Sequence, residues 1–377
     1  MAQALAAMSQ TVGPRKFLNH DLRQEHPDRM PARQVMRARC KRAATFDATF
    51  LINGVAMTFQ TLGPAFVSAD ATLVHKEFAE RGSNAMARGD IDLVRPAFDI
   101  AFDWALILLA TAFVCRFGAA AALPALVVIA NRQRALGNLL HEAGHRNLYR
   151  APRCNDFVAK ALLAPALLID LERYRATHAR HHAMLGMPAH DPDYIGPGTV
   201  RFPDWPGTYC RLLLSRRSWL ASLFGHLSDR NVSAIRRLML VAWWIAVWSL
   251  LASIAGVRYA EVFIASWYLA KATGFHAITV LREMCDHYGL HPGGIYSFTR
   301  DIVVRRPWRW LVHPHNNGYH LTHHLMPSVP YYRLPAAWQA VSQLPSYRSR
   351  SIVCTAYFWG RGAVVRLAQS AGPSNAR

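Results

Sequence analysis

Charge is scarce in this 377-residue sequence, and acidic charge is the scarcer sign. Charged residues make up 18% of the chain, with 23 Asp and Glu against 43 Lys and Arg, whereas soluble domains typically carry about 25% charged residues. Hydrophobic residues make up 52%, which excludes a disordered chain because disorder requires low hydrophobicity. The apolar residues also gather in long spans with the charges between them, a pattern that argues against an ordinary soluble enzyme.

Two other features are missing. The six cysteines form no Cys-x-x-Cys pair, so a disulfide framework is not expected and a reducing compartment fits better. Residues 1–16 contain no apolar stretch of signal-peptide length, so nothing predicts secretion.

Four apolar spans dominate the middle of the chain. The spans are residues 96–115, 117–131, 238–257 and 262–281. A helix needs about 20 predominantly apolar residues to cross a bilayer, and the third span offers 20 consecutive uncharged positions. The links at 116–118 and 258–261 are long enough only for hairpin turns. The pattern therefore predicts an all-α integral membrane fold with four transmembrane helices in two hairpins.

The basic residues predict the orientation of these helices. Arg116 and Arg258 lie in the hairpin turns and Lys271 lies inside the fourth span, which leaves 43 − 3 = 40 Lys and Arg on the other side of the membrane. Positive charge accumulates on the cytoplasmic side of membrane proteins, so both flanking segments are expected there. Orientation and contact with anionic lipid headgroups account for the net charge of +20, and no nucleic-acid partner is expected.

The spans divide the chain into three parts. Residues 1–95 form a predicted cytoplasmic extension, residues 96–340 a membrane domain, and residues 341–377 a cytoplasmic tail. Within the domain, residues 157–169 are apolar but too short to cross a bilayer, so they predict an interfacial or re-entrant helix.

Histidines cluster outside the spans, on the predicted cytoplasmic side. His-Glu-Ala-Gly-His occupies 141–145, and His-x-x-His-His occurs twice, at 178–182 and at 320–324. Residues at i, i+3 and i+4 share a helix face, so each His-x-x-His-His can aim up to three imidazoles at one point. Neutral imidazole is a common metal ligand. Eight or nine imidazoles exceed the three or four ligands of one zinc ion, so a site for two metal ions, in a helical cap over the bundle, is predicted.

These motifs resemble those of the membrane fatty acid desaturases, a family in the integral-membrane di-iron superfamily. The resemblance covers roughly residues 96–340 and includes the sequence Asn-Gly-Tyr-His-Leu-Thr-His-His-Leu-Met-Pro at 317–327. It implies two iron ions, O2 as co-substrate and an acyl chain as substrate, carried by lipid, coenzyme A or acyl carrier protein. It also implies a ninth histidine ligand after the fourth span, at His287. The nine predicted ligands are His141, His145, His178, His181, His182, His287, His320, His323 and His324.

Carboxylates near the boxes are candidates for orienting the histidine ligands, because metal-bound imidazoles commonly donate their second N–H to a carboxylate. By proximity in sequence, these candidates are Glu142, Asp191, Asp193 and Asp286. Glu283, one turn before His287, is a further candidate, since some relatives have Asn there. Lys271 and His276 lie inside the fourth span but do not share a face well, so they are interpreted as snorkelling side chains or as polar contacts between helices.

Three other interpretations compete with a desaturase. A hydroxylase of the same superfamily is favoured by Asp-His-Tyr-Gly-Leu at 286–290, whereas the spacing of the boxes and Pro327, Pro330 and Pro335 resemble desaturases. His-Glu-Ala-Gly-His also matches a zinc protease motif with Glu142 as general base, but this leaves the other clusters unexplained. A metal transporter would place its site at the bilayer midplane, not outside the spans.

A last motif concerns electron supply. His-Pro-Gly-Gly at 291–294 is the haem-binding tetrapeptide of cytochrome b5 domains, but only 25 residues separate it from His320, too few for such a domain. The tetrapeptide is therefore predicted to form a turn. The electrons are expected to come from an external ferredoxin or cytochrome b5 with its reductase, and a basic surface suits an acidic donor.

Overall fold

The computed structural model describes residues 49–52, 55–82, 91–195, 204–305 and 307–366. The chain forms two compact units, residues 1–59 and residues 60–377. In the first unit, strands β1 (Thr49–Ile52) and β2 (Val55–Thr58) pair antiparallel, with Thr49 opposite Thr58. The second unit contains every predicted site residue and is described by itself below.

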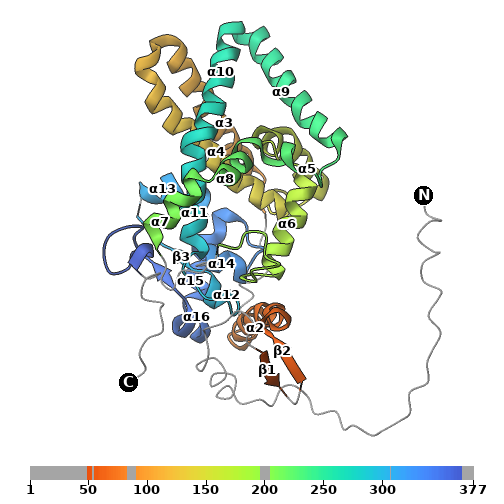
Figure 1. The fold of residues 1–377 in the computed structure, drawn as a ribbon, viewed down its shortest axis with the longest axis vertical. Helices are drawn as coiled ribbons and strands as arrows, with labels where there is room; N and C mark the ends of the chain where they lie inside the picture. The colour runs from red at the N-terminus through yellow and green to blue at the C-terminus, as the bar shows by residue number, and fades with distance from the viewer. Residues whose placement is uncertain (1–48, 53–54, 83–90, 196–203, 306, 367–377) are drawn as a thin grey trace, which may run out of the picture. The chain divides into compact units, whose positions relative to one another are not determined.

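The second unit is built almost entirely from helices (Figure 1). The longer ones are α2 (Phe59–Glu80), α3 (Val94–Phe117), α4 (Ala119–Gly144), α6 (Leu171–Ala183), α7 (Trp205–Leu214), α8 (Arg216–Phe224), α9 (Ala234–Ala255), α10 (Val257–Ala270), α11 (His276–His287) and α15 (Leu334–Val341). The shorter helical segments are α5 (Pro152–Val158), η2 (Ala159–Leu163), η3 (Pro165–Leu167), η4 (Gly225–Ser228), η5 (Lys271–Phe275), α12 (Ile295–Phe298), α13 (Trp308–Val312), η6 (Pro314–Asn316), α14 (His320–Leu325), η7 (Tyr331–Arg333) and α16 (Pro345–Arg350).

Two helical hairpins, α3–α4 and α9–α10, project toward the same end of this unit (Figure 1). Gly118 joins the first pair with φ 64°, and Gly256 joins the second with φ 90°. Positive φ is readily available only to glycine, so these residues end one helix and reverse the chain. The predicted turn at 258–261 is wrong by a few residues: the charged residues there are already helical in α10, and glycine makes the turn.

Two described helices, α3 and α9, are long and apolar enough to cross a membrane. Only 28% of the apolar window of α3 and 11% of that of α9 are buried inside the structure. The second predicted span lies in the first half of α4, and the fourth lies along α10, η5 and the start of α11. The apolar side chains of α3 and α9 therefore face mostly outward.

Residues 157–169 do not form the single short helix that the sequence predicts. Helix α5 runs into the π-helix η2, and the chain then tightens into the 3-10 turn η3 at Pro165. Leu168 ends the segment with φ 60°. Proline cannot donate the helical hydrogen bond, which explains why regular helix stops there.

Aromatic packing joins the two hairpins. Trp267 of α10 is fully buried and stacks on Trp104 of α3, with ring centroids 5.4 Å apart. Trp244 of α9 packs edge-on against Trp267, with ring centroids also 5.4 Å apart. Aromatic pairs contribute beyond the area they bury, so these three rings fix how the hairpins pack.

The two acidic residues in the first span are both paired. Asp103 contacts the Arg132 guanidinium of α4 at 2.7 Å and the Nε2 atom of His315 at 2.7 Å. Asp99 accepts a hydrogen bond from the Tyr331 hydroxyl at 2.5 Å. Polar groups in an apolar helix need such partners, and here the partners come from segments next to the site.

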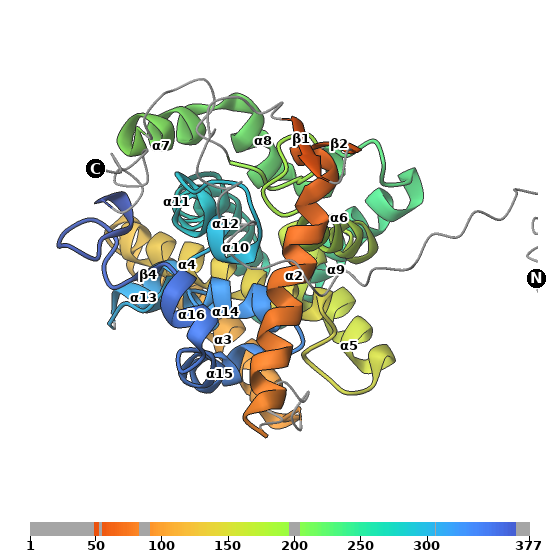
Figure 2. The ribbon, with the colours of Figure 1, turned by 90° about the horizontal axis from the view of Figure 1, so that it is seen from below.

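Segments far apart in the sequence pack together at the end of the unit opposite the hairpins. Strand β3 (Asp301–Ile302) pairs in parallel with β4 (Val353–Cys354). The Glu77 carboxylate of α2 accepts hydrogen bonds from the backbone N–H (3.0 Å) and hydroxyl (2.7 Å) of Ser346. Figure 2 shows α2 crossing this end of the molecule near α14 and α16. Parts of the predicted extension and tail thus pack within the second unit.

Residues 291–294 connect α11 to α12 as a bend, with Gly293 at φ 149° and Gly294 at φ 114°. The prediction that this tetrapeptide forms a turn is confirmed.

Candidate metal centre

The nine predicted histidine ligands converge into two groups. Within each group, every residue offers a ring nitrogen within 4.8 Å of the others. The larger group contains His141, His145, His178, His182 and His323. The smaller group contains His181, His287, His320 and His324. Five and four nitrogen donors match the ligand numbers that two separate metal ions require.

The nitrogens within a group lie as far apart as ligands of one ion. Nε2 atoms are separated by 2.8 Å between His145 and His178 and by 3.1 Å between His178 and His182. In the smaller group the Nε2 atoms of His287 and His320 are 2.9 Å apart. Two nitrogens that are each about 2.1 Å from a shared ion lie roughly 3.0–3.4 Å from one another. The donor sets therefore fit one ion per group.

Each His-x-x-His-His box contributes to both groups, which corrects the expectation that one box aims at one point. In α6, His178 and His182 join the larger group and His181 joins the smaller one. In α14 the assignment is reversed, because His320 and His324 join the smaller group. Residues i and i+4 lie about 40° apart around a helix, whereas i+3 lies about 100° from i+4. The i, i+4 pair thus faces one site and the i+3 residue the other.

Burial keeps most of these imidazoles neutral. It lowers the pKa of His145 to about 4, with the neighbouring His181 adding to the effect, and it lowers the pKa of His287 to about 4. The Nε2 atom of His141 is buried with no hydrogen-bond partner among the described residues. A neutral imidazole with a free lone pair is the form that binds a metal ion, so the site has the right chemistry for one.

Asp191 orients His181. The Nδ1 atom of His181 donates to the Asp191 carboxylate at 2.7 Å, and backbone N–H groups of Gly186 and Asp193 hold the same carboxylate at 2.8 and 2.9 Å. Burial alone would lower the pKa of His181, but this hydrogen bond raises it overall. With Nδ1 donating, Nε2 faces the smaller group, as expected for a metal-ligating histidine.

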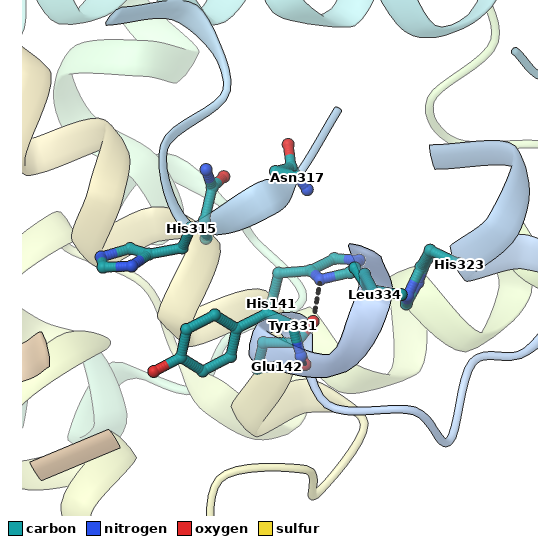
Figure 3. A pocket seen from close by; sticks show the side chains of 8 residues that line it. His141, Glu142, His315, Asn317, His323, Tyr331 and Leu334 are labelled. Atoms are coloured by element: carbon teal, nitrogen blue, oxygen red, sulfur yellow. Dashed lines mark hydrogen bonds and ion pairs between the residues drawn. The ribbon is translucent and has the colours of Figure 1, made fainter. Parts of the chain in front are cut away.

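Glu142 plays the corresponding part for His141. The Nδ1 atom of His141 lies 3.2 Å from the Glu142 carboxylate, which also accepts the backbone N–H of Tyr331 at 2.9 Å. Figure 3 shows this contact and the His323 ring on the other side of His141. Burial raises the pKa of Glu142 to about 8. Its contacts with His141 and with the Tyr331 backbone indicate that Glu142 orients His141.

The other three carboxylate candidates differ in their placement. Asp286 is fully buried, contacts Arg282 at 2.8 Å and His313 at 3.2 Å, and lies 3.7 Å from the Nδ1 atom of His320. Asp193 is 57% exposed and 3.9 Å from the Nδ1 atom of His181. Glu283 has no ion pair among the described residues and lines a cavity beside the histidines. Of these three carboxylates, Asp286 alone therefore lies within a buried network around the histidines.

Sequence reasoning missed two positioning groups. The backbone carbonyl of Phe298 accepts from the Nδ1 atom of His287 at 2.9 Å. Asp301 accepts hydrogen bonds from the backbone N–H and hydroxyl of Thr322 at 3.0 and 2.6 Å. Because Thr322 lies between two of the histidines of α14, these bonds fix the position of that helix. A backbone carbonyl leaves no sequence signal, and Asp301 lies too far from the box in sequence to stand out.

The interpretation of Lys271 and His276 as helix contacts is confirmed. Lys271 donates to the backbone carbonyl of Ser222 in α8, and His276 contacts the Ser222 hydroxyl at 2.8 Å. Lys271 also lines the cavity beside the histidines, a role that sequence reasoning did not assign.

Helical hairpins with two adjacent groups of convergent histidines, each able to hold a metal ion, define a helical protein with a candidate metal centre of the histidine-box type. The sequence model of the fatty acid desaturase family matches residues 117–355, and the chain belongs to this family. It is a desaturase-like oxidoreductase, which sets aside the protease and transporter interpretations. The chain is also similar to dihydrorhizobitoxine desaturase of Bradyrhizobium elkanii, with 25% identity over 247 residues, covering 59% of this chain and 68% of that protein.

Proposed function

We propose that the chain is a membrane-bound, O2-dependent di-iron desaturase that introduces a carbon–carbon double bond into a saturated chain. The observation that carries this proposal is the division of nine buried or partly buried histidines into groups of five and four, with ring nitrogens spaced as ligands of one ion in each. For the family, an acyl chain bound to lipid, coenzyme A or acyl carrier protein is the expected substrate.

Side chains alone cannot perform the oxidation. Iron bound at the two groups would supply the oxidising power to remove hydrogen from an unactivated methylene. The overall reaction consumes O2, two electrons and two protons, releases two water molecules and leaves a double bond. The electrons would come from an external ferredoxin or cytochrome b5 with its reductase.

The protein's own residues prepare this chemistry. Asp191, Glu142 and the Phe298 carbonyl hold imidazole Nδ1–H groups, so that Nε2 lone pairs face the metal positions. Such outer contacts fix the tautomer and the ring orientation of a ligand. Burial keeps water away from the reacting carbons, which favours oxidation of the substrate over loss of the oxidant.

The proposed topology has four transmembrane helices, from α3, α4, α9 and the α10–η5–α11 run, with a cytoplasmic cap that carries the boxes. It is supported by the two hairpins pointing to one end (Figure 1) and by the outward-facing apolar side chains of α3 and α9. The distribution of Lys and Arg supports a cytoplasmic position for the cap, the site and both flanking segments. Lipid bilayer is then the main surrounding partner.

Product analysis tests the function. The full chain is expressed in membranes with an electron donor, and its products are separated and weighed by mass spectrometry. Loss of two hydrogens from the substrate supports a desaturase. Gain of one oxygen atom would instead show the hydroxylase of the same superfamily, and metal analysis giving one zinc and no iron would contradict both.

A further inference from the structure

A cavity of about 320 Å³ lies beside both histidine groups. His141 and His178 of the larger group and His181 and His287 of the smaller one line one part of it. The wall also includes Lys271, which precedes His287 by sixteen residues on the same helical run. The lining residues therefore run along η5 and α11, with the histidines at the α11 end.

The other end holds two buried cations. Lys271 is 2% exposed and Arg134 is 8% exposed. Arg134 donates to the side-chain oxygen of Asn138 at 2.8 and 3.1 Å, and Lys271 donates to the Ser222 carbonyl. Among the described residues no carboxylate lies within 4.0 Å of either charge. Burying a charge without a counter-ion is costly, so a ligand that supplies an anion would relieve both residues.

The backbone is shaped to keep these cations on the cavity wall. Lys271 and Phe275 belong to the five-residue π-helix η5, a geometry that is rare and frequent at functional sites. The Phe275 ring lies 4.8 Å from the Lys271 ammonium and 6.0 Å from the Arg134 guanidinium. Gly137 faces the same guanidinium: a Cβ atom there would lie 2.9 Å from the Nη2 atom of Arg134.

The remaining charges of the cavity lie toward the histidines. Arg282 is paired with Asp286 at 2.8 Å, so it has a counter-ion already. Glu283 is one helical turn from His287, and Asp193 lies 3.9 Å from His181. Glu283 also acts electrostatically on Arg134, so the least compensated positive charge of the cavity among the described residues is that of Lys271. Arg134 precedes His141 by seven residues on α4, roughly 10 Å along the helix.

We propose that this cavity binds the substrate and that the substrate ends in a free carboxylate, which Arg134 and Lys271 hold while the carbons to be oxidised lie at the histidines. The inference rests on the proposed function and specifies its substrate. A thioester or lipid ester carries no charge at the carbonyl for these two side chains to hold. The charged end also fixes the distance between the carboxylate and the double bond.

Binding to the purified, iron-loaded full chain in detergent tests the proposal. The probes are decanoate, decanol as a neutral chain of equal length, and decanoyl-coenzyme A, followed by calorimetry. We expect decanoate to bind about tenfold or more tightly than decanol, since hydrogen bonds to charged groups are the strong ones. Equal affinity for decanoate and decanol, or stronger binding of the coenzyme A ester, would overturn the proposal.

Variants locate the carboxylate. Lys271→Met removes a buried charge and should fold, and we expect it to lose about tenfold in decanoate affinity while its decanol affinity stays unchanged. Lys160→Met is the matched control, because Lys160 is 53% exposed and paired with Glu172 on the surface. Gly137→Ala keeps every charge but displaces the Arg134 guanidinium, and it should also weaken decanoate binding. Unchanged decanoate affinity in both cavity variants would contradict the assignment.

Iron content and O2 consumption, measured on the same preparations, separate the two proposals. A chain that binds iron and forms product but does not distinguish decanoate from decanol contradicts only the carboxylate site. A chain that binds decanoate through Lys271 but holds no iron contradicts the proposed function.

Discussion

His182 and His324 stack with their ring centroids 4.1 Å apart and their planes 21° from parallel, although they belong to different histidine groups. The two candidate metal positions are therefore separated by these stacked rings, and histidines of both groups line one cavity. This arrangement suits a reaction in which two ions act together on one substrate.

The smaller group should be the more sensitive to loss of a ligand. His287→Ala leaves three histidines there, whereas His145→Ala leaves four in the larger group. We expect His287→Ala to retain about one iron per chain, since the loss of one of four ligands weakens metal binding more than the loss of one of five. Metal analysis by mass spectrometry checks this, with the exposed His75→Ala as control. Full iron content in His287→Ala would remove this residue from the site.

Asp191→Asn should weaken iron binding about 10–100-fold, the usual effect of losing a carboxylate behind a ligating histidine. The amide cannot accept all three hydrogen bonds that the carboxylate receives from His181, Gly186 and Asp193. Asp193→Asn is the control, because that carboxylate is more than half exposed and does not bond His181 directly. Competition with a chelator measures both affinities, and equal values would show that Asp191 is only structural.

The buried pair between α3 and α4 should stabilise the hairpin strongly. Asp103→Leu leaves the Arg132 guanidinium, which is 1% exposed, without its counter-ion. We expect the free energy of unfolding to fall by about 3–5 kcal/mol. The double variant Asp103→Leu, Arg132→Leu should recover much of this loss, because it removes both charges. Unfolding in detergent measures the cycle, and additive effects of the two substitutions would contradict a coupled pair.

His291→Ala should leave iron content and turnover nearly unchanged, because its tetrapeptide is a bend between α11 and α12. Metal analysis and turnover are compared between the variant and the unchanged chain. The visible spectrum of the purified protein shows whether a haem is bound. A haem absorption band that disappears in the variant would show that the tetrapeptide holds a haem after all.

Much of this organisation was predictable from local patterns. The histidine spacings predicted which residues converge, because i, i+3 and i+4 relations depend only on helix geometry. The division of each box between two groups was not predictable, since it depends on where α6 and α14 lie around the site. The position of the second hairpin turn was also not predictable. The turn was expected at the charged residues 258–261, but Gly256 makes it.

The cavity could not be predicted from the sequence, for a different reason. Lys271 stood out as a charge in an apolar span, but its partners come from α8 and α4, far away in sequence. Arg134 lies just beyond the second apolar span and belongs to no motif. Contacts of this kind are set by tertiary packing, and a single sequence contains no signal that pairs Arg134 with Lys271.

The sharing of each box between both histidine groups limits how such a chain can diverge. One residue inserted or deleted within a box turns the following side chains by about 100°, so His181 and His182, or His323 and His324, would be redirected together. Both sites would be lost in one event, and neither can be acquired or discarded alone. The loops between the boxes are free of this constraint, and length changes in the family should accumulate there.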